Sequence, residues 1–253
     1  MPVNSGPPSV GSADVVARTL RVELTAARGR RGGGAPRVLD VGGGSGSWAV
    51  PLAVEGCAVT VVDTSANALS VLLRRAREAG VGSNVQAVQG DVDALSDAVP
   101  EADADLVLGH GLLEYVDDPA SAVSALAGAV VVGGALSVLA AGRFAAVLSR
   151  VVAGRIAEAR RLLLDPAGRW GPADPLQRRM DVEELRVLLE ADGRLAVERI
   201  QGHRVLADLV PAPLVENGGL SPADLEELED TAAGTPPLRD MAARLHVLAR
   251  RTA

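Results

Sequence analysis

The sequence predicts an α/β fold in which helices cover both faces of a mostly parallel, seven-stranded sheet. From residue 37 onwards, short apolar runs alternate with segments of helical apolar spacing. Such alternation is typical of parallel sheets, whose strands are nearly continuous in apolar residues because both faces are buried. We therefore expect one domain over residues 36–253, preceded over residues 1–35 by a mobile arm and a helix.

The first half of the chain is the more regular half. Strands are expected at residues 37–41, 58–62, 84–88, 104–108 and 135–139, and helices at 14–28, 45–54, 66–79 and 119–131. In the second half we expect helices at 144–164, 181–190 and 221–231, strands at 195–201 and 244–249, and a loop at 165–175. Residues 141–180 interrupt the regular pattern and are expected to form an Arg-rich insertion on the substrate side.

Composition excludes several classes of protein. The net charge of −7 argues against a protein that binds nucleic acid through bulk positive charge, and all basic residues are Arg, which excludes a catalytic lysine. The single cysteine, Cys57, allows no internal disulfide and fits a reducing, cytoplasmic location. No run of 18 apolar residues occurs, and the three histidines show no metal-ligand spacing, so we expect neither a membrane partner nor a metal. The oligomeric state is not predicted.

A glycine-rich turn follows the first predicted strand. The segment VLDVGGGSG, residues 38–46, contains Gly42, Gly43, Gly44 and Gly46. Glycines there let the backbone approach a ligand closely, and the helix that follows offers free N–H groups to a phosphate or a carboxylate. The alternative is a tight turn that binds no ligand.

Two aspartates accompany this turn. Asp63 ends the second predicted strand, 17 positions after Gly46, where a carboxylate can accept hydrogen bonds from ribose hydroxyls. Asp40 precedes the turn; it would repel a pyrophosphate but attract the amine of a sulfonium ligand. A nicotinamide dinucleotide is the rival ligand, because Gly44, Gly46 and Ala49 formally satisfy its G-x-G-x-x-A pattern.

These motifs resemble those of the class I S-adenosylmethionine-dependent methyltransferases, which have a Rossmann-like fold. The likeness covers roughly residues 36–140 and rests on the glycine turn, Asp63, the GDV segment 90–92, the segment GHGLLEYV at 109–116 and the GGAL turn at 133–136. The resemblance implies S-adenosylmethionine as cofactor. It places cofactor contacts at Asp40, Gly42, Gly43, Gly44, Gly46, Asp63, Thr64, Asp91, Val92, Asp93 and His110.

Finer features resemble one subgroup, the tRNA methyltransferases that esterify 5-carboxymethoxyuridine. The three consecutive glycines, the 110–116 segment and GHRV at 202–205 carry this likeness. It implies tRNA as a partner. A carboxylate acceptor would need a cation to hold it in line, and Arg204 or an arginine of residues 143–179 could serve. The N-terminal Arg that contacts the cofactor in that subgroup has only loose counterparts here, Arg18 and Arg21.

The expected substrate side is the one cationic region of the chain. Eight arginines lie between residues 143 and 179, and Trp170 in the loop could stack on a base. The candidate substrate-binding residues are Glu114, Tyr115, Arg160, Arg161, Trp170, His203 and Arg204. For each, ordinary packing or a solvated surface is the alternative.

The expected function is methyl transfer, with His110 and Arg204 as catalytic candidates. A carboxylate acceptor needs no base, whereas a hydroxyl or an amine calls for one, and His110 is the best placed residue. A tRNA carboxylate is the leading acceptor, and a small-molecule O- or N-methyltransferase is the alternative. A non-catalytic module that binds the cofactor is the third hypothesis.

Overall fold

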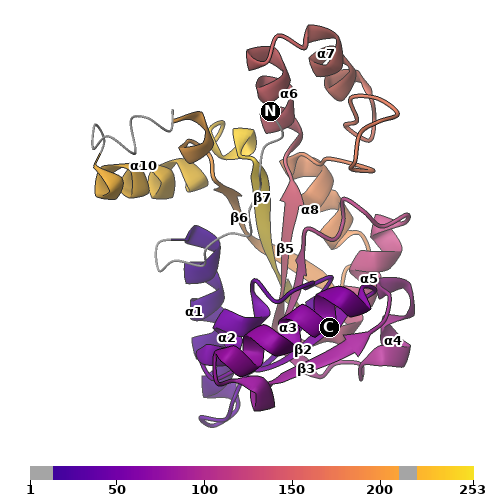
Figure 1. The fold of residues 1–253 in the computed structure, drawn as a ribbon, viewed down its shortest axis with the longest axis vertical. Coiled ribbons are helices and arrows are strands. Elements are labelled where there is room, and N and C mark those ends of the chain that lie inside the picture. Colours follow the sequence, from indigo (N-terminus) through magenta and orange to yellow (C-terminus); the bar gives the residue numbers. More distant parts are fainter. Residues whose placement is uncertain (1–13, 211–220) are drawn as a thin grey trace. The chain divides into compact units, whose positions relative to one another are not determined.

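The structure is a computed structural model that describes residues 14–210 and 221–253 (Figure 1). The predicted arm over residues 1–12 lies outside this part of the chain. The chain forms a seven-stranded sheet in the order β3-β2-β1-β4-β5-β7-β6, which confirms the predicted fold class. By its internal contacts it divides into two compact units: residues 1–110, 121–137 and 250–253 form the first, and residues 111–120 and 138–249 form the second.

The first unit contains the parallel part of the sheet. Its strands are β1 (Arg37–Val41), β2 (Ala58–Asp63), β3 (Val85–Gln89) and β4 (Ala104–His110), followed by the start of β5 (Val130–Ala141). Strand β1 pairs in parallel with β2 and β4, and β2 pairs in parallel with β3. Because the strands are parallel and in register, the carboxyl ends of β1 and β2 meet at one edge, where Val41 is opposite Val62.

Helices complete the first unit. They are α1 (Val15–Arg30), α2 (Ala49–Val54), α3 (Ala66–Glu78), the short α4 (Leu95–Ala98) after the 3-10 turn η2 (Val92–Ala94), and α5 (Pro119–Ala129). The side chain of Asp14 caps α1, and Ser65 caps α3, as their polar side chains and positions at the first turn predict. Arg250 joins α1 through two hydrogen bonds to Glu23, of 2.6 and 2.9 Å.

The second unit contains the end of β5, the strands β6 (Leu195–His203) and β7 (Arg244–Arg251), and several helices. Its helices are α6 (Arg143–Val152), α7 (Ile156–Leu164), α8 (Val182–Glu190) and α10 (Pro222–Gly234). Short turns, η3 (Ala207–Leu209) and η4 (Arg239–Met241), flank α10. Asp181 caps α8 and forms a reciprocal capping box with Glu184.

Three predictions at segments that contain glycine were wrong. Helix α2 begins at Ala49 instead of residue 45, because Gly44 and Gly46 have positive φ and keep the chain in a turn. The single helix expected over 144–164 is two helices, separated at Gly154, whose φ is +70°. The turn expected at Gly133 lies inside β5 instead.

Candidate functional site

The glycine turn leaves β1 and leads into α2 by a path that needs left-handed backbone. Gly42, Gly44 and Gly46 have φ values of 73°, 55° and 81°, which residues with a Cβ rarely adopt. The N–H of Gly42 donates to the carbonyl of Val62 at 2.8 Å, so the turn begins on the neighbouring strand β2. Glycine at these positions therefore fixes the shape of the turn.

Asp40 lies directly beneath the turn and has an oxygen without a partner. A Cβ at Gly43 would lie 2.5 Å from Oδ2 of Asp40, so only glycine fits above the carboxyl group. The side chain is 1% exposed, and Oδ2 has no hydrogen-bond partner among the described residues. Burial, and then the charge of Asp63, raises the pKa of Asp40 to about 7. The site thus contains a buried acceptor that a cation or a donor could satisfy.

Asp63 closes the turn from β2. Its Oδ2 accepts a hydrogen bond from the N–H of Gly44 at 2.9 Å, and its Oδ1 accepts one from the N–H of Ser65 at 2.8 Å. Each carboxylate oxygen has roughly two acceptor positions, so each keeps one for a ligand hydroxyl. The predicted pairing of the turn with Asp63 is therefore a direct contact.

Arg75 is a turn contact that sequence reasoning missed. It lies in α3, and its Nη1 donates to the carbonyl of Ser45 at 3.0 Å. The only signal in the sequence is an arginine nine positions after the start of α3, which by itself is typical of an exposed helix face. Arg75 fixes the far side of the glycine turn.

The segment after β3 has the residues expected beside an adenine ring. Val92 is buried, whereas Asp91 and Asp93 are exposed. The carboxylate of Asp91 accepts from the N–H of Asp93 at 3.2 Å and caps η2. The carbonyl of Thr64 accepts from the side chain of Gln89 at 3.2 Å.

His110 ends β4 and contacts two residues of the first unit. Its Nε2 lies 2.8 Å from Oγ of Ser137 on β5, and the ring of Trp48 meets the imidazole edge-on at 4.8 Å between centroids. These contacts fix the plane of the imidazole ring. Strand β4 is two residues longer than the predicted strand, so His110 is its last residue, and the hydrogen bond to Ser137 orients the ring.

Glu114 in the second unit is a buried carboxyl group with an incomplete set of partners. Its Oε1 accepts from the N–H of Ala141 at 2.9 Å and lies 3.7 Å from Nη1 of Arg244. Its side chain is almost fully buried, and Oε2 has no hydrogen-bond partner among residues 14–210 and 221–253. Burial raises the pKa of Glu114, although its backbone contacts and Arg244 favour the charged form.

The loop that contains Glu114 is held by two neighbouring side chains. Arg178 donates to the carbonyls of Leu113, Val116 and Asp117, at 2.8 Å for the first and 3.0 Å for the last. Gln177 donates from its side chain to the carbonyl of Tyr115 at 2.9 Å. The ring of Tyr115 is exposed. Arg178 thus fixes the backbone next to two candidate residues, Glu114 and Tyr115.

The Arg-rich stretch is largely engaged in internal contacts. Ion pairs join Arg143 to Glu184, Arg150 and Arg155 to Glu158, and Arg179 to Asp174. Arg150 also lies over the ring of Trp170, 5.0 Å from its centroid. Among the described residues, Arg160 and Arg161 form no ion pair and are exposed. They are the arginines of α7 that a ligand could reach directly.

His203 and Arg204 lie at the end of β6. His203 is buried, whereas Arg204 is exposed and has a φ of +59°. The three N–H groups that follow, from Val205 to Ala207, all donate to the carboxylate of Glu229 in α10. This contact holds the turn after Arg204.

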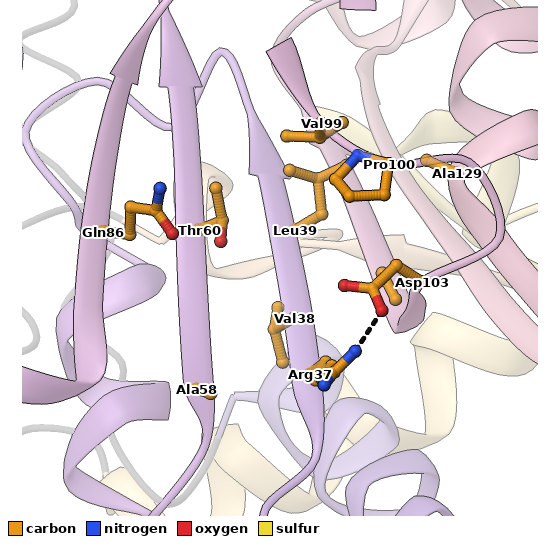
Figure 2. A pocket seen from close by; sticks show the side chains of 11 residues that line it. Arg37, Val38, Leu39, Ala58, Thr60, Gln86, Val99, Pro100, Asp103 and Ala129 are labelled. Atoms are coloured by element: carbon orange, nitrogen blue, oxygen red, sulfur yellow. Dashed lines mark hydrogen bonds and ion pairs between the residues drawn. The ribbon is translucent and has the colours of Figure 1, made fainter. Parts of the chain in front are cut away.

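A hollow of about 220 Å³ lies on the first unit, far from the turn along the strands. Figure 2 shows that it is lined from β1, β2 and β3 by Leu39, Thr60 and Gln86, with Val99 and Pro100 on the other side. Arg37 and Asp103 form an ion pair at its margin (Figure 2). Arg37 and Ala58 begin their strands, whereas the glycine turn follows the end of β1, so the hollow is separate from the candidate site.

No group of three or more His, Cys, Asp or Glu side chains in the described part of the chain is placed to hold a metal ion. No described helix is long and apolar enough to cross a membrane.

Comparison with known proteins finds a family likeness in the first half of the chain. Residues 38–134 match the family model described as a methyltransferase domain. The match covers 97 of the 253 residues, so this part of the chain is similar to a methyltransferase domain. The matched residues include the glycine turn, Asp63, the 90–93 segment and His110.

Relatives and solved structures agree with the methyltransferase domain. The tRNA 5-carboxymethoxyuridine methyltransferase of Escherichia coli K12 is 33% identical over 118 residues, which cover 47% of this chain and 45% of that protein. The ubiquinone biosynthesis O-methyltransferase of Serratia proteamaculans is 43% identical over 97 residues, 38% of this chain and 39% of that protein. The chain thus matches less than half the length of these curated relatives.

The fold of this chain is shared with solved structures along most of its length. An S-adenosylmethionine-dependent methyltransferase from Mesorhizobium loti has a TM-score of 0.57 at 20% identity, and the match covers 95% of this chain and 99% of that one. Geranyl diphosphate C-methyltransferase from Streptomyces coelicolor, solved with S-adenosylhomocysteine, has a TM-score of 0.55 at 18% identity, covering 93% and 78%. At such identities the likeness establishes the fold.

Proposed function

We propose that this protein is an S-adenosylmethionine-dependent methyltransferase that binds its cofactor over the glycine turn. The observation that carries the proposal is the buried, partnerless Oδ2 of Asp40 beneath Gly43. A cationic ammonium group satisfies such a carboxylate, whereas the pyrophosphate of a dinucleotide would be repelled by it.

The other residues of the turn would hold the rest of the cofactor. Asp63 would accept from the ribose hydroxyls at the acceptor positions that Gly44 and Ser65 leave open. Val92 would pack on the adenine, and the exposed carboxylates of Asp91 and Asp93 would accept from its amino group. S-adenosylmethionine supplies a methyl group whose transfer leaves a neutral thioether. The protein's part is therefore to orient the acceptor and exclude water.

Calorimetry with S-adenosylhomocysteine tests the cofactor site. We expect binding in the micromolar range, about −8 kcal/mol, and no tight binding of NADH. Asp40→Asn should weaken binding because it removes the charge that faces the ammonium group. Tight NADH binding without S-adenosylhomocysteine binding would overturn the proposal. Binding of S-adenosylhomocysteine without methyl transfer to any acceptor would identify a non-catalytic module.

For the acceptor we propose a hydroxyl group of a small molecule. Glu114 supports this choice, because its buried Oε2 has no hydrogen-bond partner among the described residues and could accept a hydrogen bond from a hydroxyl group. A hydroxyl must lose its proton as the new O–CH3 bond forms, and Glu114 or His110 would accept it. The O-methyltransferases of ubiquinone biosynthesis among the relatives also favour a small-molecule acceptor.

A carboxylate of a modified wobble uridine in tRNA is the second candidate acceptor. Arg160 and Arg161 favour it because they are exposed and form no ion pair with a described residue. The tRNA methyltransferase relative also supports it. In this case Arg204 would hold the carboxylate in line, and His203, Tyr115 and Trp170 would contact the nucleotide.

Salt dependence distinguishes the two acceptors. For binding to a single-stranded loop, the logarithm of the association constant falls linearly with the logarithm of the salt concentration. The slope is about −0.7 for each phosphate neutralised. A tRNA acceptor contacted at three or four phosphates would give a slope of roughly −2 to −3. A small-molecule hydroxyl acceptor would give a nearly flat response. Mass spectrometry of tRNA nucleosides from a deletion strain is the complementary test, since an unchanged methyl ester level would exclude the tRNA acceptor.

A further inference from the structure

The α6–α7 hairpin, residues 143–164, leaves several large aliphatic side chains exposed to solvent. Five aliphatic side chains stand out from it: Val151, Val152, Ile156, Leu163 and Leu164. Val152 is 85% exposed, Leu164 69% and Ile156 61%. None of the residues of α6 is fully buried. Contiguous exposed apolar groups of this kind usually mark an interaction surface.

The exposed side chains share one face. In α7, residues at positions i, i+4, i+7 and i+8 lie on the same side of a helix, and here they are Ile156, Arg160, Leu163 and Leu164. The buried Ala159 and Leu162 lie along one flank of this face. Val151 and Val152 end α6 just before the turn at Gly154, so they lie beside Ile156 at the tip of the hairpin. The outward face is therefore apolar and basic at once.

The charge of the hairpin is opposite to that of the remaining chain. Five arginines and one glutamate give residues 143–164 a formal charge of +4, whereas the chain as a whole has −7, which leaves −11 for the rest. The glutamate, Glu158, is half-buried and paired with Arg150 and Arg155. An anionic surface would attract the hairpin and repel the rest of the protein, so charge alone would orient the molecule.

We propose that the tip and outer face of the α6–α7 hairpin dock on an anionic lipid bilayer. The aliphatic side chains would enter the boundary between headgroups and acyl chains, and Arg155, Arg160 and Arg161 would lie among the lipid phosphates. This contact is peripheral and involves no spanning helix. It departs from the sequence-based expectation of no membrane partner, which rested on the lack of a long apolar run.

The surface fits lipid better than two other occupants. In a symmetric pair of copies the same patch faces itself, which would bring two charges of +4 together. Interfaces with nucleic acid are polar and strongly basic, and five exposed aliphatic side chains would gain nothing from phosphates. A bilayer with anionic headgroups satisfies both the apolar and the basic side chains.

Co-sedimentation of the full chain with lipid vesicles tests the proposal. We expect binding to vesicles of phosphatidylglycerol and phosphatidylcholine, and little binding to phosphatidylcholine alone. High salt should weaken binding without abolishing it, because only the arginine contribution is screened. The measurement needs no cofactor or acceptor, so it stands or falls independently of the proposed function.

Two pairs of variants separate the contributions of the hairpin. Val152→Asp/Ile156→Asp should reduce binding to the level seen with phosphatidylcholine, while the matched control Val187→Asp, at an equally exposed position of α8, should bind normally. Arg160→Glu/Arg161→Glu should weaken binding at least 25-fold, at about fivefold for each charge removed. Arg77→Glu/Arg199→Glu makes the same change in charge elsewhere and should have a much smaller effect.

Circular dichroism and S-adenosylhomocysteine binding should be unchanged in all four variants, which excludes misfolding as the cause. Three results would overturn the proposal. One is equal binding to both kinds of vesicle or to neither. Another is a dimer that Val152→Asp/Ile156→Asp dissociates, with no vesicle binding. The last is tRNA binding that depends on Arg160 and Arg161 but not on the aliphatic pair.

Discussion

The N–H of Gly44 donates to Oδ2 of Asp63 across 2.9 Å, so the turn after β1 and the end of β2 are joined before any ligand binds. The carboxylate is thereby held at the edge where a ribose would lie. A preformed acceptor of this kind lowers the ordering cost of binding. The same bond means that a change at Asp63 affects both the ligand contact and the turn.

Asp63→Ala should weaken S-adenosylhomocysteine binding by about 1.5–3 kcal/mol, the range for hydrogen bonds to a charged group. Calorimetry measures this loss. Asp97→Ala removes an exposed carboxylate of α4 and should leave binding unchanged. Undiminished binding in Asp63→Ala would show that the carboxylate does not contact the ligand.

Gly43→Ala should abolish cofactor binding, because its Cβ would lie 2.5 Å from both Cγ and Oδ2 of Asp40. Gly44→Val should also abolish it, here through backbone strain of about 1–3 kcal/mol at a φ of +55°. Gly80→Ala is the control, since its φ of +74° imposes similar strain but its Cβ meets nothing within 4 Å. Calorimetry measures cofactor binding and thermal melting measures stability in all three variants, so the two methods together separate steric from conformational effects. Normal cofactor binding in Gly43→Ala would contradict the assignment of the glycine turn as the cofactor site.

Asp40 should make both stability and binding depend on pH. Burial, and then the charge of Asp63, raises its pKa from 3.8 to about 7 in the folded protein. Because the folded pKa is the higher one, the contribution of Asp40 to stability is complete below pH about 4 and is lost as the pH rises through about 7. Cofactor binding should change in the opposite direction, because the ammonium group favours ionised Asp40.

Urea unfolding of the ligand-free protein between pH 4 and 8, beside Asp40→Asn, checks the first effect. In Asp40→Asn, the free energy of unfolding should not show the decline that is caused by ionisation of Asp40. Calorimetry at pH 6 and pH 8 checks the effect on cofactor binding. The unsubstituted protein should bind S-adenosylhomocysteine more tightly at pH 8 than at pH 6, whereas Asp40→Asn should not. Identical pH profiles for the two proteins would refute the role of Asp40.

Arg178→Met should impair methyl transfer while leaving cofactor affinity nearly unchanged. The guanidinium holds the carbonyls of Leu113, Val116 and Asp117, and its loss should free the loop that contains Glu114. We expect a higher KM for the acceptor and a loss of stability of about 1–3 kcal/mol. Arg186→Met in α8 is the control. Equal kinetics in both variants would mean that the loop needs no clamp.

The proximity of the glycine turn and Asp63 was predictable because the motif is local. Strand β1, the glycine turn and Asp63 lie within 27 consecutive residues, and parallel pairing of β1 with β2 brings their ends together. Arg75 was not predicted, since nothing in a helical arginine indicates that it reaches the carbonyl of Ser45. The partnerless oxygen of Asp40 also depends on burial that composition does not reveal.

The second unit was less predictable because its contacts are distant in sequence. The eight arginines between residues 143 and 179 predict a cationic surface, yet Arg143, Arg178 and Arg179 are used to hold the backbone and neighbouring acids. The exposed aliphatic side chains of α7 follow the same apolar spacing as buried ones. Only the structure shows that Leu162 is covered and Leu163 is not.

The hydrogen bonds between Arg178 and the 113–117 loop limit how acceptor specificity can be transferred to this protein from another methyltransferase. An exchange of residues 141–180 for the corresponding segment of another methyltransferase would replace Arg178 and Gln177 but leave the carbonyls that they hold. In a working chimera, the 113–117 loop and residues 141–180 therefore have to be exchanged together. In natural variation, the two segments should likewise change together, and a library that randomises only one of them would yield mostly inactive proteins.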